Sequence, residues 1–303
     1  PEVQAFVDRM VEKHSYDRDK LLSVLSDAES KQSILDAISR PAERTLEWHE
    51  YRNIFMKPER ISAGAEFWRE HEAELERISK DTGVSKEIIV GIIGVETYFG
   101  RITGNYRVLD ALSTLAFDYP PRSKFFTGEL EEFLLLVREE GMEAADATGS
   151  YAGAMGRPQF MPSSYRAYAV DSTDDGKRDI WTNWSDVMGS VANYFVRHGW
   201  IEDQPVVASA TLGAQWQGDT PENTLKPQET VTSLSHQGVM FSSELPGDAK
   251  SQLLTLKGED GEEYWVGFHN FFVITRYNRS VMYGLAVHQL GQEIAEEVRD
   301  SGS

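Results

Sequence analysis

The chain has 303 residues, enough for one large domain or for two to three smaller ones. It carries 49 Asp and Glu against 30 Lys and Arg, and its formal net charge of -19 argues against nucleic acid or an anionic membrane surface as the main partner. The absence of cysteine excludes disulfides, thiolate metal sites and thiol nucleophiles. No apolar run of about 18 residues predicts a transmembrane segment, and no signal peptide or anchor is recognisable in the sequence.

The first third of the chain predicts amphipathic helices, because apolar residues recur at helical spacing among charged ones. Asp19 and Ser30 are predicted to cap two early helices, and Pro41 to end this group. The segment 46–55 carries an aromatic stripe that includes Tyr51, and a stripe of this kind is usually part of a core.

The stretch 88–100, IIVGIIGVETYFG, is almost wholly apolar and yet contains Glu96. We expect Gly83 to end the helix before it and Ser85 to begin the helix that carries it. One reading is an ordinary helix end whose glutamate bends out to water. The other is a general acid, because apolar surroundings raise the pKa of a carboxyl group and keep a proton available.

The segments that follow Gly100 alternate between helices and a long polar loop. Two prolines, Pro120 and Pro121, interrupt one helical pattern, and a clean amphipathic helix is predicted over 129–141. The Gly-rich stretch 149–168 has no sustained periodicity, and loops of this length in compact domains are usually functional.

The composition changes after Trp200 to segments rich in β-branched and aromatic residues. Asp260 and Gly261 separate two of them, which predicts a hairpin. We therefore expect a small β-rich module, followed by a closing amphipathic helix from about residue 279.

The acidic segment 171–182, DSTDDGKRDIWT, resembles the calcium-binding loop of EF-hands. It departs from the pattern in having Thr173 in place of Asp or Asn and Thr182 in place of the bidentate Glu, for which Asp186 could substitute. The predicted oxygen ligands are Asp171, Thr173, Asp175, the carbonyl of Lys177, and Asp186. Two readings remain open: a structural cation, calcium or sodium, or an acidic turn without metal.

Several long blocks occur in the order of one enzyme family: GIIGVET, NYRVLDALSTLAFDYPPR, GSYAGAMGRPQFMPSSY, GSVANYFVRHGW and ITRYN. With them, the chain resembles the membrane-bound B type of lytic transglycosylases (MltB-like, glycoside hydrolase family 103), here in a soluble form. The resemblance extends from about residue 51 to residue 292. It implies cleavage of the β-1,4 bond between MurNAc and GlcNAc in peptidoglycan, without water, to leave 1,6-anhydroMurNAc ends.

The resemblance implies an α+β fold that is mainly α: a lysozyme-like, goose-type helical catalytic core with an α domain and a small β-rich domain. We expect the α domain at 1–75, completed by the C-terminal helix 279–303. The core would span 76–200 and contain the EF-hand-like loop 171–186, and the β-rich domain would span 201–278.

The resemblance also assigns site residues. Glu96 corresponds to the single catalytic acid, and no cofactor takes part in catalysis. Residues matching sugar- or peptide-contacting positions are Tyr51, Arg122, Ser150, Gln159, Phe160, Tyr194, Tyr277, Asn278 and Tyr283. Pro121 stands where the family often has the first of two arginines, so one contact made there lacks its side chain.

One carboxyl group suffices for this chemistry, whereas most glycosidases use two. Glu96 would protonate the leaving oxygen and then take a proton from the C6 hydroxyl, which attacks C1 at high effective concentration. Asp110 and Asp118 are expected to be caps or ion-pair partners rather than a second catalytic acid. The implied partners are peptidoglycan glycan strands and other cell-wall synthases or hydrolases, and the implied location is the periplasm.

Two other functions are weighed against this one. A lysozyme-type muramidase would use water in place of the C6 hydroxyl, and the products would then keep one more water. A non-catalytic cell-wall binding module would have no need for an acid set among apolar residues, such as Glu96.

Overall fold

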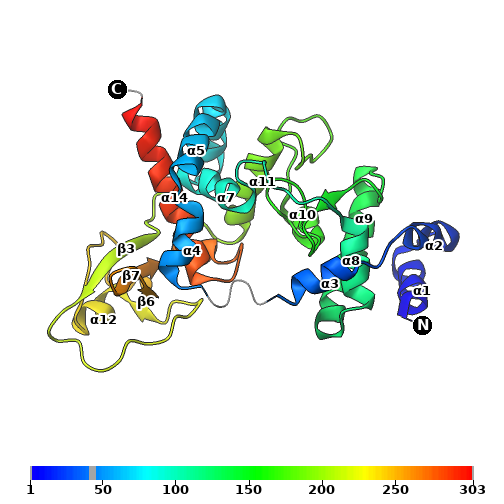
Figure 1. The fold of residues 1–303 in the computed structure, drawn as a ribbon. Coiled ribbons are helices and arrows are strands. Elements are labelled where there is room, and N and C mark those ends of the chain that lie inside the picture. Colours follow the sequence, from blue (N-terminus) through cyan, green and yellow to red (C-terminus); the bar gives the residue numbers. More distant parts are fainter. Residues whose placement is uncertain (1, 41–45, 302–303) are drawn as a thin grey trace. The chain divides into compact units, whose positions relative to one another are not determined.

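The computed structural model describes residues 2–40 and 46–301 (Figure 1). Its contacts divide the chain into two compact units, one of residues 1–42 and 100–190 and the other of residues 43–99 and 191–303. Each unit is built from two separate stretches of sequence. The sequence predicted three domains instead, with boundaries near residues 75, 200 and 278, and these domains remain a prediction.

The first unit is helical. α8 packs against α9, α3 and a 3-10 turn, and α10 packs against α9. The apolar run in VLDALSTLAF makes α8 buried on nearly every side, which explains why it lies at the centre. The unit consists of α1 (Glu2–His14), α2 (Arg18–Ser26), α3 (Gln32–Ile38), β1 (Tyr106–Arg107), α8 (Val108–Phe117), η1 (Pro120–Arg122), α9 (Ser123–Glu140), β2 (Thr148–Gly149), α10 (Pro162–Tyr168) and the first half of α11 (Trp184–Arg197).

Buried carboxylates of α8 and α9 bind the N-terminal segment of this unit through hydrogen bonds and ion pairs. Glu131 of α9 accepts hydrogen bonds at 2.7 Å from both Lys13 and His14 of α1. Asp110 of α8 is fully buried, accepts the backbone N–H of Glu29 at 2.9 Å and lies 3.5 Å from the ammonium of Lys31. The expected structural role of Asp110 is confirmed.

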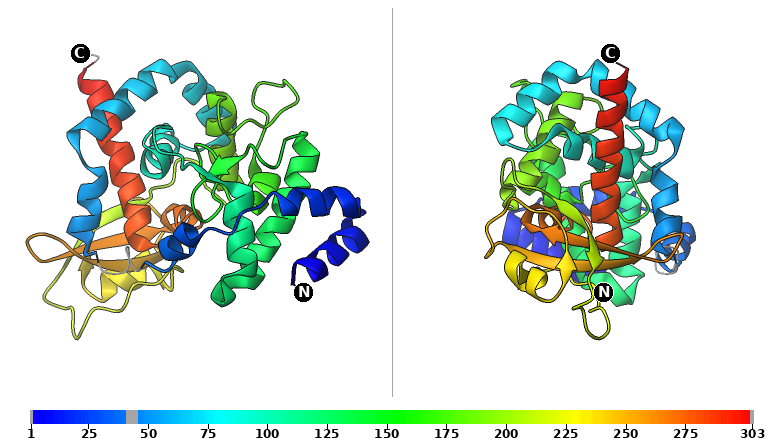
Figure 2. Two further views of the ribbon diagram at one scale, coloured as in Figure 1. Left: turned by 45° about the vertical axis from the view of Figure 1, so that its right-hand side comes forward. Right: turned by 90° about the vertical axis from the view of Figure 1, so that its left-hand side faces the viewer.

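The second unit is organised around its last helix, α14, which contacts α4, α5 and α7. In both views of Figure 2 this helix (red) lies beside the blue helices α4 and α5. The helices of the unit are α4 (Trp48–Phe55), α5 (Pro58–Glu70), α6 (Glu72–Thr82), α7 (Lys86–Thr97), the second half of α11, α12 (Val231–His236), α13 (His269–Ile274) and α14 (Val281–Asp300).

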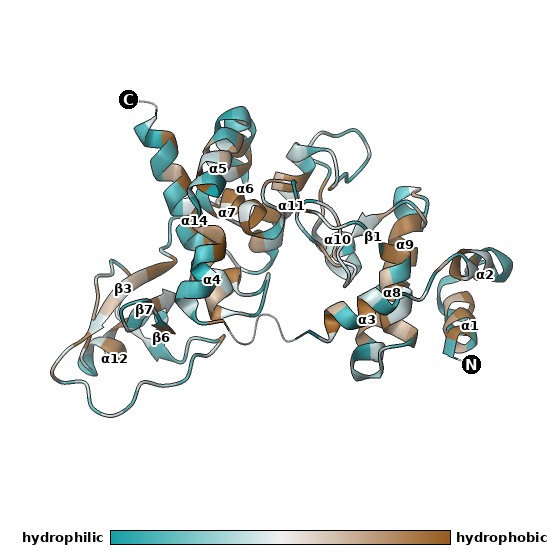
Figure 3. Ribbon diagram, in the orientation of Figure 1, coloured by the Kyte–Doolittle hydropathy of each residue, from teal (hydrophilic) through white to brown (hydrophobic). Residues whose placement is uncertain are grey.

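Glycines let α7 and α14 approach closely. A Cβ on Gly91 of α7 would lie 2.4 Å from the carbonyl oxygen of Val287, and one on Gly291 of α14 would lie 2.2 Å from that of Glu87. Real Cβ atoms do not approach backbone oxygen so closely, so only glycine fits at either position. Figure 3 colours much of α7 as hydrophobic, in keeping with a helix enclosed by neighbours. This packing fixes the helix that carries Glu96.

The β-rich part of the second unit is a five-stranded antiparallel sheet in the order β4-β6-β7-β3-β5. The hairpin predicted at Asp260 and Gly261 is confirmed, with Leu253 opposite Val266 in its register. Leu234 of α12 packs with these two residues in a small core. The strands are β3 (Val207–Leu212), β4 (Glu229–Thr230), β5 (Val239–Met240), β6 (Lys250–Lys257) and β7 (Glu262–Phe268).

Helix boundaries agree with the sequence in part. Gly83 ends α6 with a positive φ of 72°, and Ser85 precedes α7 as predicted. The predicted caps at Asp19 and Ser30 are wrong. Asp17 caps α2 instead, and the hydroxyl of Ser30 donates to Asp118 while another residue precedes α3. Pro41 lies outside the described residues.

The predicted fold class is confirmed: the chain is mainly helical, with a small five-stranded antiparallel sheet and a two-stranded antiparallel pair, β1 and β2. Over the described ranges, none of the helices is long and apolar enough to cross a bilayer.

Candidate active site

Glu96 lies in the last turn of α7 and is half-buried. The helix ends abruptly after Thr97, because Tyr98 and Phe99 both adopt left-handed backbone conformations with φ of 50° and 57°. Bulky side chains rarely adopt this conformation, and such strain is often found at functional sites. The N–H groups of these two residues close the end of the helix on the carbonyls of Gly94 and Ile93.

Two tyrosines of the same unit surround the carboxyl group. The hydroxyl of Tyr283 donates to Oε1 of Glu96 at 2.5 Å, and Tyr283 is only 2% exposed. Burial and the negative charge of Glu96 raise the pKa of Tyr283 well above its usual value, and the same two causes act on Tyr277. Both phenols therefore keep their protons, and the one on Tyr283 fixes the orientation of the carboxyl group.

Ser280 caps α14 by accepting the N–H of Tyr283, which places that side chain in the first turn of the helix. Sequence positions 96 and 283 are thus brought together by the α7–α14 contact. Tyr51 is 7% exposed, packs edge-on against Phe55 with ring centroids 5.2 Å apart, and contributes to the electrostatic surroundings of Tyr283.

Tyr194 of α11 also joins this group. Its ring lies 4.8 Å from that of Tyr277, and its hydroxyl donates to the carbonyl of Arg276 at 2.7 Å. Asn278 is exposed, and its carbonyl accepts the N–H of Ser280 at the start of α14. The second unit therefore gathers Glu96 with the predicted tyrosines, each held by a named partner.

The remaining substrate-contact candidates belong to the first unit. Oγ of Ser150 accepts the N–H groups of Ala152 and Ala154, at 3.2 and 3.1 Å, and so fixes the turn of the Gly-rich loop. Gln159 has a positive φ of 55° and donates from its amide to the carbonyls of Thr103 and Gly156.

Phe160 and Arg122 have different surroundings in the first unit. Phe160 is 2% exposed and pairs through its backbone with Met155. Arg122 ends η1 and lies over the rings of Phe125 and Phe126, at 4.5 and 5.1 Å, beside a hollow of about 720 Å³.

The acidic loop is ordered around Asp171. Its carboxylate accepts the N–H groups of Thr173, Asp175 and Gly176, and Asp175 accepts that of Lys177 at 2.9 Å. Gly176 has a φ of 85°, which the sharp turn of this loop requires. These hydrogen bonds lower the pKa of Asp171 although burial opposes them, so it is ionised at neutral pH.

Asp186 is fully buried and accepts the N–H of Ser172 at 2.7 Å and that of Asp179 at 2.9 Å. It therefore joins both arms of the loop to α11. Over the described residues, no three or more Asp, Glu or His side chains are grouped closely enough to hold a metal. The predicted oxygen donors of the loop, the carboxylates of Asp171, Asp175 and Asp186 with a Thr hydroxyl and a carbonyl, are nevertheless of the kind that a hard cation prefers.

Three residues near these sites were not found from the sequence. Arg60 donates to the carbonyl of Gly94 at 3.1 Å and lies 4.5 Å over the ring of Tyr98, so it supports the end of α7. Arg157 lies 3.9 Å over Trp184 and donates to the carbonyl of Thr182, which joins the Gly-rich loop to the acidic loop. Each of these two arginines lies far in sequence from the carbonyl that it contacts, so no sequence motif could reveal the contact.

Asp179 is the third of these residues, and its carboxylate accepts the N–H groups of Trp181 and Thr182. Asp179 is the ninth residue of the EF-hand-like loop. In EF-hands the ninth position supplies a ligand, so this spacing could have identified Asp179 from the sequence.

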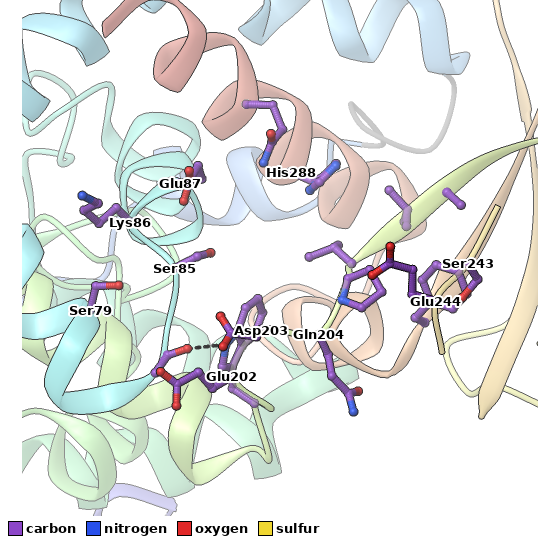
Figure 4. A pocket seen from close by; sticks show the side chains of 18 of the residues that line it. Ser79, Ser85, Lys86, Glu87, Glu202, Asp203, Gln204, Ser243, Glu244 and His288 are labelled. Carbon is purple, nitrogen blue, oxygen red and sulfur yellow. Dashed lines mark hydrogen bonds between the residues drawn. The ribbon is translucent and has the colours of Figure 1, made fainter. Parts of the chain in front are cut away.

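One hollow of the second unit, about 760 Å³, has none of the predicted site residues in its lining (Figure 4). Its labelled side chains come from α6, from Ser85 and α7, from α14, and from the segments 202–204 and 243–244. This hollow therefore does not coincide with the candidate site around Glu96.

Comparison with known proteins gives consistent matches. Residues 1–292 match the transglycosylase SLT domain family. The chain is 42% identical over 306 residues to the membrane-bound lytic murein transglycosylase B of Escherichia coli (strain K12), covering 97% of this chain and 83% of that protein.

Solved structures give the same result. Catenated lytic transglycosylase SltB1 of Pseudomonas aeruginosa matches with a TM-score of 0.94 and 51% identity, over 98% of both chains. Escherichia coli lytic transglycosylase Slt35, solved in complex with calcium, matches with a TM-score of 0.88 and 42% identity, over 98% of this chain and 94% of that one. The chain therefore belongs to the transglycosylase SLT domain family, and the resemblance found in its sequence is confirmed.

Proposed function

We propose that this lytic transglycosylase, an enzyme of peptidoglycan, uses Glu96 as its single acid and base. The observation that carries the proposal is the carboxyl group at the end of α7, held by a hydrogen bond of 2.5 Å from the buried hydroxyl of Tyr283. A positioned carboxyl group at the strained end of a packed helix is suited to proton transfer, because its geometry is fixed before the substrate binds.

The proposed reaction has two proton transfers. Glu96 gives its proton to the oxygen between MurNAc C1 and GlcNAc C4 as the C1–O bond breaks, and the GlcNAc leaves as an alcohol. The C6 hydroxyl of the same MurNAc then attacks C1 and returns its proton to Glu96. The product is a 1,6-anhydro ring, no water is consumed, and the enzyme ends in its starting protonation state.

The aromatic residues support the sugar in this scheme. Tyr194, Tyr277 and Tyr51 are proposed to contact the sugar, and Asn278 is an exposed residue just before α14. Ser150, Gln159, Phe160 and Arg122 are proposed to contact the glycan or its peptide. The match to lytic transglycosylases favours the transglycosylase over a muramidase.

We assign a structural role to the acidic loop: Asp171, Thr173, Asp175 and the carbonyl of Lys177 would hold calcium or sodium, with Asp186 closing the loop. Slt35, which was solved with calcium, supports this assignment. The ion would take no part in the proton transfers. The expected location is the periplasm, where peptidoglycan lies, and other cell-wall synthases or hydrolases are the proposed partners.

The test is the Glu96→Gln variant on purified sacculi. It should fold, bind glycan and release no anhydromuropeptides, because the amide keeps the shape of the side chain but has no proton to give. The matched control is Glu87→Gln on the first turn of the same helix, which should retain wild-type turnover. Near-normal release by Glu96→Gln would show that the acid lies elsewhere.

A further inference from the structure

A second hollow of the second unit is lined by cations, although the chain as a whole is strongly acidic. It measures about 580 Å³ and is lined by Arg197, Lys226 and Arg276 together with His198 and His269. Among its described lining residues, none is a carboxylate. In a chain of net charge -19 this is a local reversal of sign.

The hollow of Figure 4 has the opposite character in the same unit. Glu87, Glu202, Asp203 and Glu244 line it, against one cation, Lys86. Lys86 also forms an ion pair with a glutamate, at 2.5 Å. The two hollows would therefore select ligands of opposite charge, and the basic one suits an anion.

The two imidazoles of the basic hollow are held by backbone carbonyls. Nδ1 of His198 donates to the carbonyl of Tyr194, and Nε2 of His269 to that of Gly199, each at 2.6 Å. Burial, with the charges of Arg276 and Arg197, lowers the pKa of His198, so it is neutral at pH 7. His198 therefore adds no positive charge to the hollow at neutral pH, whereas Arg197, Lys226 and Arg276 do.

Two residues that line the basic hollow, His198 and Arg276, contact Tyr194, one of the tyrosines near Glu96. The ring of His198 stacks on that of Tyr194 at 4.0 Å, and the hydroxyl of Tyr194 donates to the carbonyl of Arg276. Tyr194 in turn lies 4.8 Å from Tyr277, whose pKa responds to the charge of Glu96. A glycan lying on this tyrosine pair would have the basic hollow beside it.

We propose that the basic hollow binds carboxylates of the peptide stem carried by the glycan strand. This proposal rests on the proposed function, since it requires a peptidoglycan strand at the tyrosine pair. Guanidinium groups pair with carboxylates through two parallel hydrogen bonds, which suits Arg197 and Arg276. Leu225, Phe272 and Val273 add an apolar lining on which the aliphatic side chains of a stem can pack.

The test compares glycan strands that carry peptide stems with the same strands after an amidase has removed the stems. The double variant Lys226→Gln/Arg276→Gln should raise KM on the stem-bearing strands about five- to tenfold, as expected for two partly exposed charge pairs, and leave kcat near wild type. On stem-free strands it should match the wild type. The control is Lys250→Gln, an exposed cation of β6 outside the hollow.

Equal KM values for the double variant and the wild type on stem-bearing strands would overturn the proposal. An equal rise in KM on stem-bearing and stem-free strands would also overturn it. Calorimetry with isolated stem peptide and with inorganic phosphate separates the sources of the anion. Stem peptide should bind the wild type and not the double variant, whereas binding of phosphate alone would contradict the proposal. The proposed function fails separately, if wild-type enzyme releases no anhydro ends from either substrate.

Discussion

At the scale of single residues, the proposed chemistry depends on one hydrogen bond. Tyr283 is buried, retains its proton because burial and the charge of Glu96 raise its pKa, and donates to Oε1 of that carboxyl group. A donor that cannot ionise at neutral pH holds the carboxyl group in one orientation in both of its protonation states. In the proposed mechanism, Tyr283 is therefore a positioning residue for the acid.

Removing that hydroxyl should slow the chemical step without changing substrate affinity. We expect Tyr283→Phe to lower kcat about tenfold, the effect of one hydrogen bond to a charged group, while KM stays within a factor of two. Steady-state kinetics on solubilised glycan measure both constants. An unchanged kcat would show that Glu96 is positioned by other contacts.

At the scale of elements, the contact between α7 and α14 brings Glu96 and Tyr283 together. Gly91→Ala would place a Cβ 2.4 Å from the carbonyl oxygen of Val287, so the two helices would have to separate. We expect a loss of about 2–4 kcal/mol in unfolding free energy, together with most of the activity. Urea unfolding measures the first and product release the second.

Gly128→Ala is the matched control, because the same substitution in the middle of α9 would meet no atom within 4 Å. It should stabilise the chain by about 0.5–1 kcal/mol through helix propensity. Similar losses in Gly91→Ala and Gly128→Ala would show that close helix contact is not what the first glycine provides.

The attachment of α1 to α9 predicts a dependence of stability on pH. Burial opposes ionisation of Glu131, but hydrogen bonds from Lys13 and His14 hold its pKa at about 2. A carboxyl group whose pKa is lower in the folded chain stabilises it above pH ~4.5, and this contribution is lost as the pH falls towards 2. Glu131→Gln should therefore cost about 1–2 kcal/mol at pH 7, with exposure of its partners limiting the effect.

Unfolding of the wild type and Glu131→Gln at pH 7 and at pH 3 checks this. The difference in unfolding free energy should be smaller at pH 3. A difference that stayed constant across this range would mean that Glu131 contributes by its shape rather than by its charge.

The acidic loop predicts an effect of calcium on stability. Adding calcium should raise the melting temperature of the wild type by a few degrees, because an ion that binds only the folded loop stabilises it. In Asp171→Asn the shift should be much smaller, while turnover under mild conditions persists. A wild-type melting temperature that ignores both calcium and chelator would remove the metal from this account.

At the scale of the whole molecule, sequence patterns predicted the helical and β-rich regions, the hairpin at Gly261 and the apolar helix that carries Glu96. They could not predict that Tyr283 meets Glu96, since this contact joins positions 187 residues apart. The support of α7 by Arg60 was missed for the same reason. The prediction that Ser30 caps a helix was wrong because its hydroxyl donates a hydrogen bond to Asp118, a residue far away in the sequence.

The resemblance to a family supplied the site residues that periodicity alone could not. Glu96 read by itself was compatible with an ordinary helix end, and the ordered blocks along the chain are what favours a general acid. The structure adds the surroundings of that glutamate. Its carboxyl group accepts a hydrogen bond from a buried tyrosine, and two residues with left-handed backbone end its helix. Two glycines let that helix pack closely on α14.

The most direct test of the central claim is digestion of sacculi in water enriched in heavy oxygen, followed by mass analysis of the new glycan ends. A single acid that recovers its proton from the C6 hydroxyl uses no water, so the new MurNAc ends should be anhydro rings without the label, and Glu96→Gln should yield none. Heavy oxygen in the new ends formed by the wild type would show a hydrolase and contradict the mechanism.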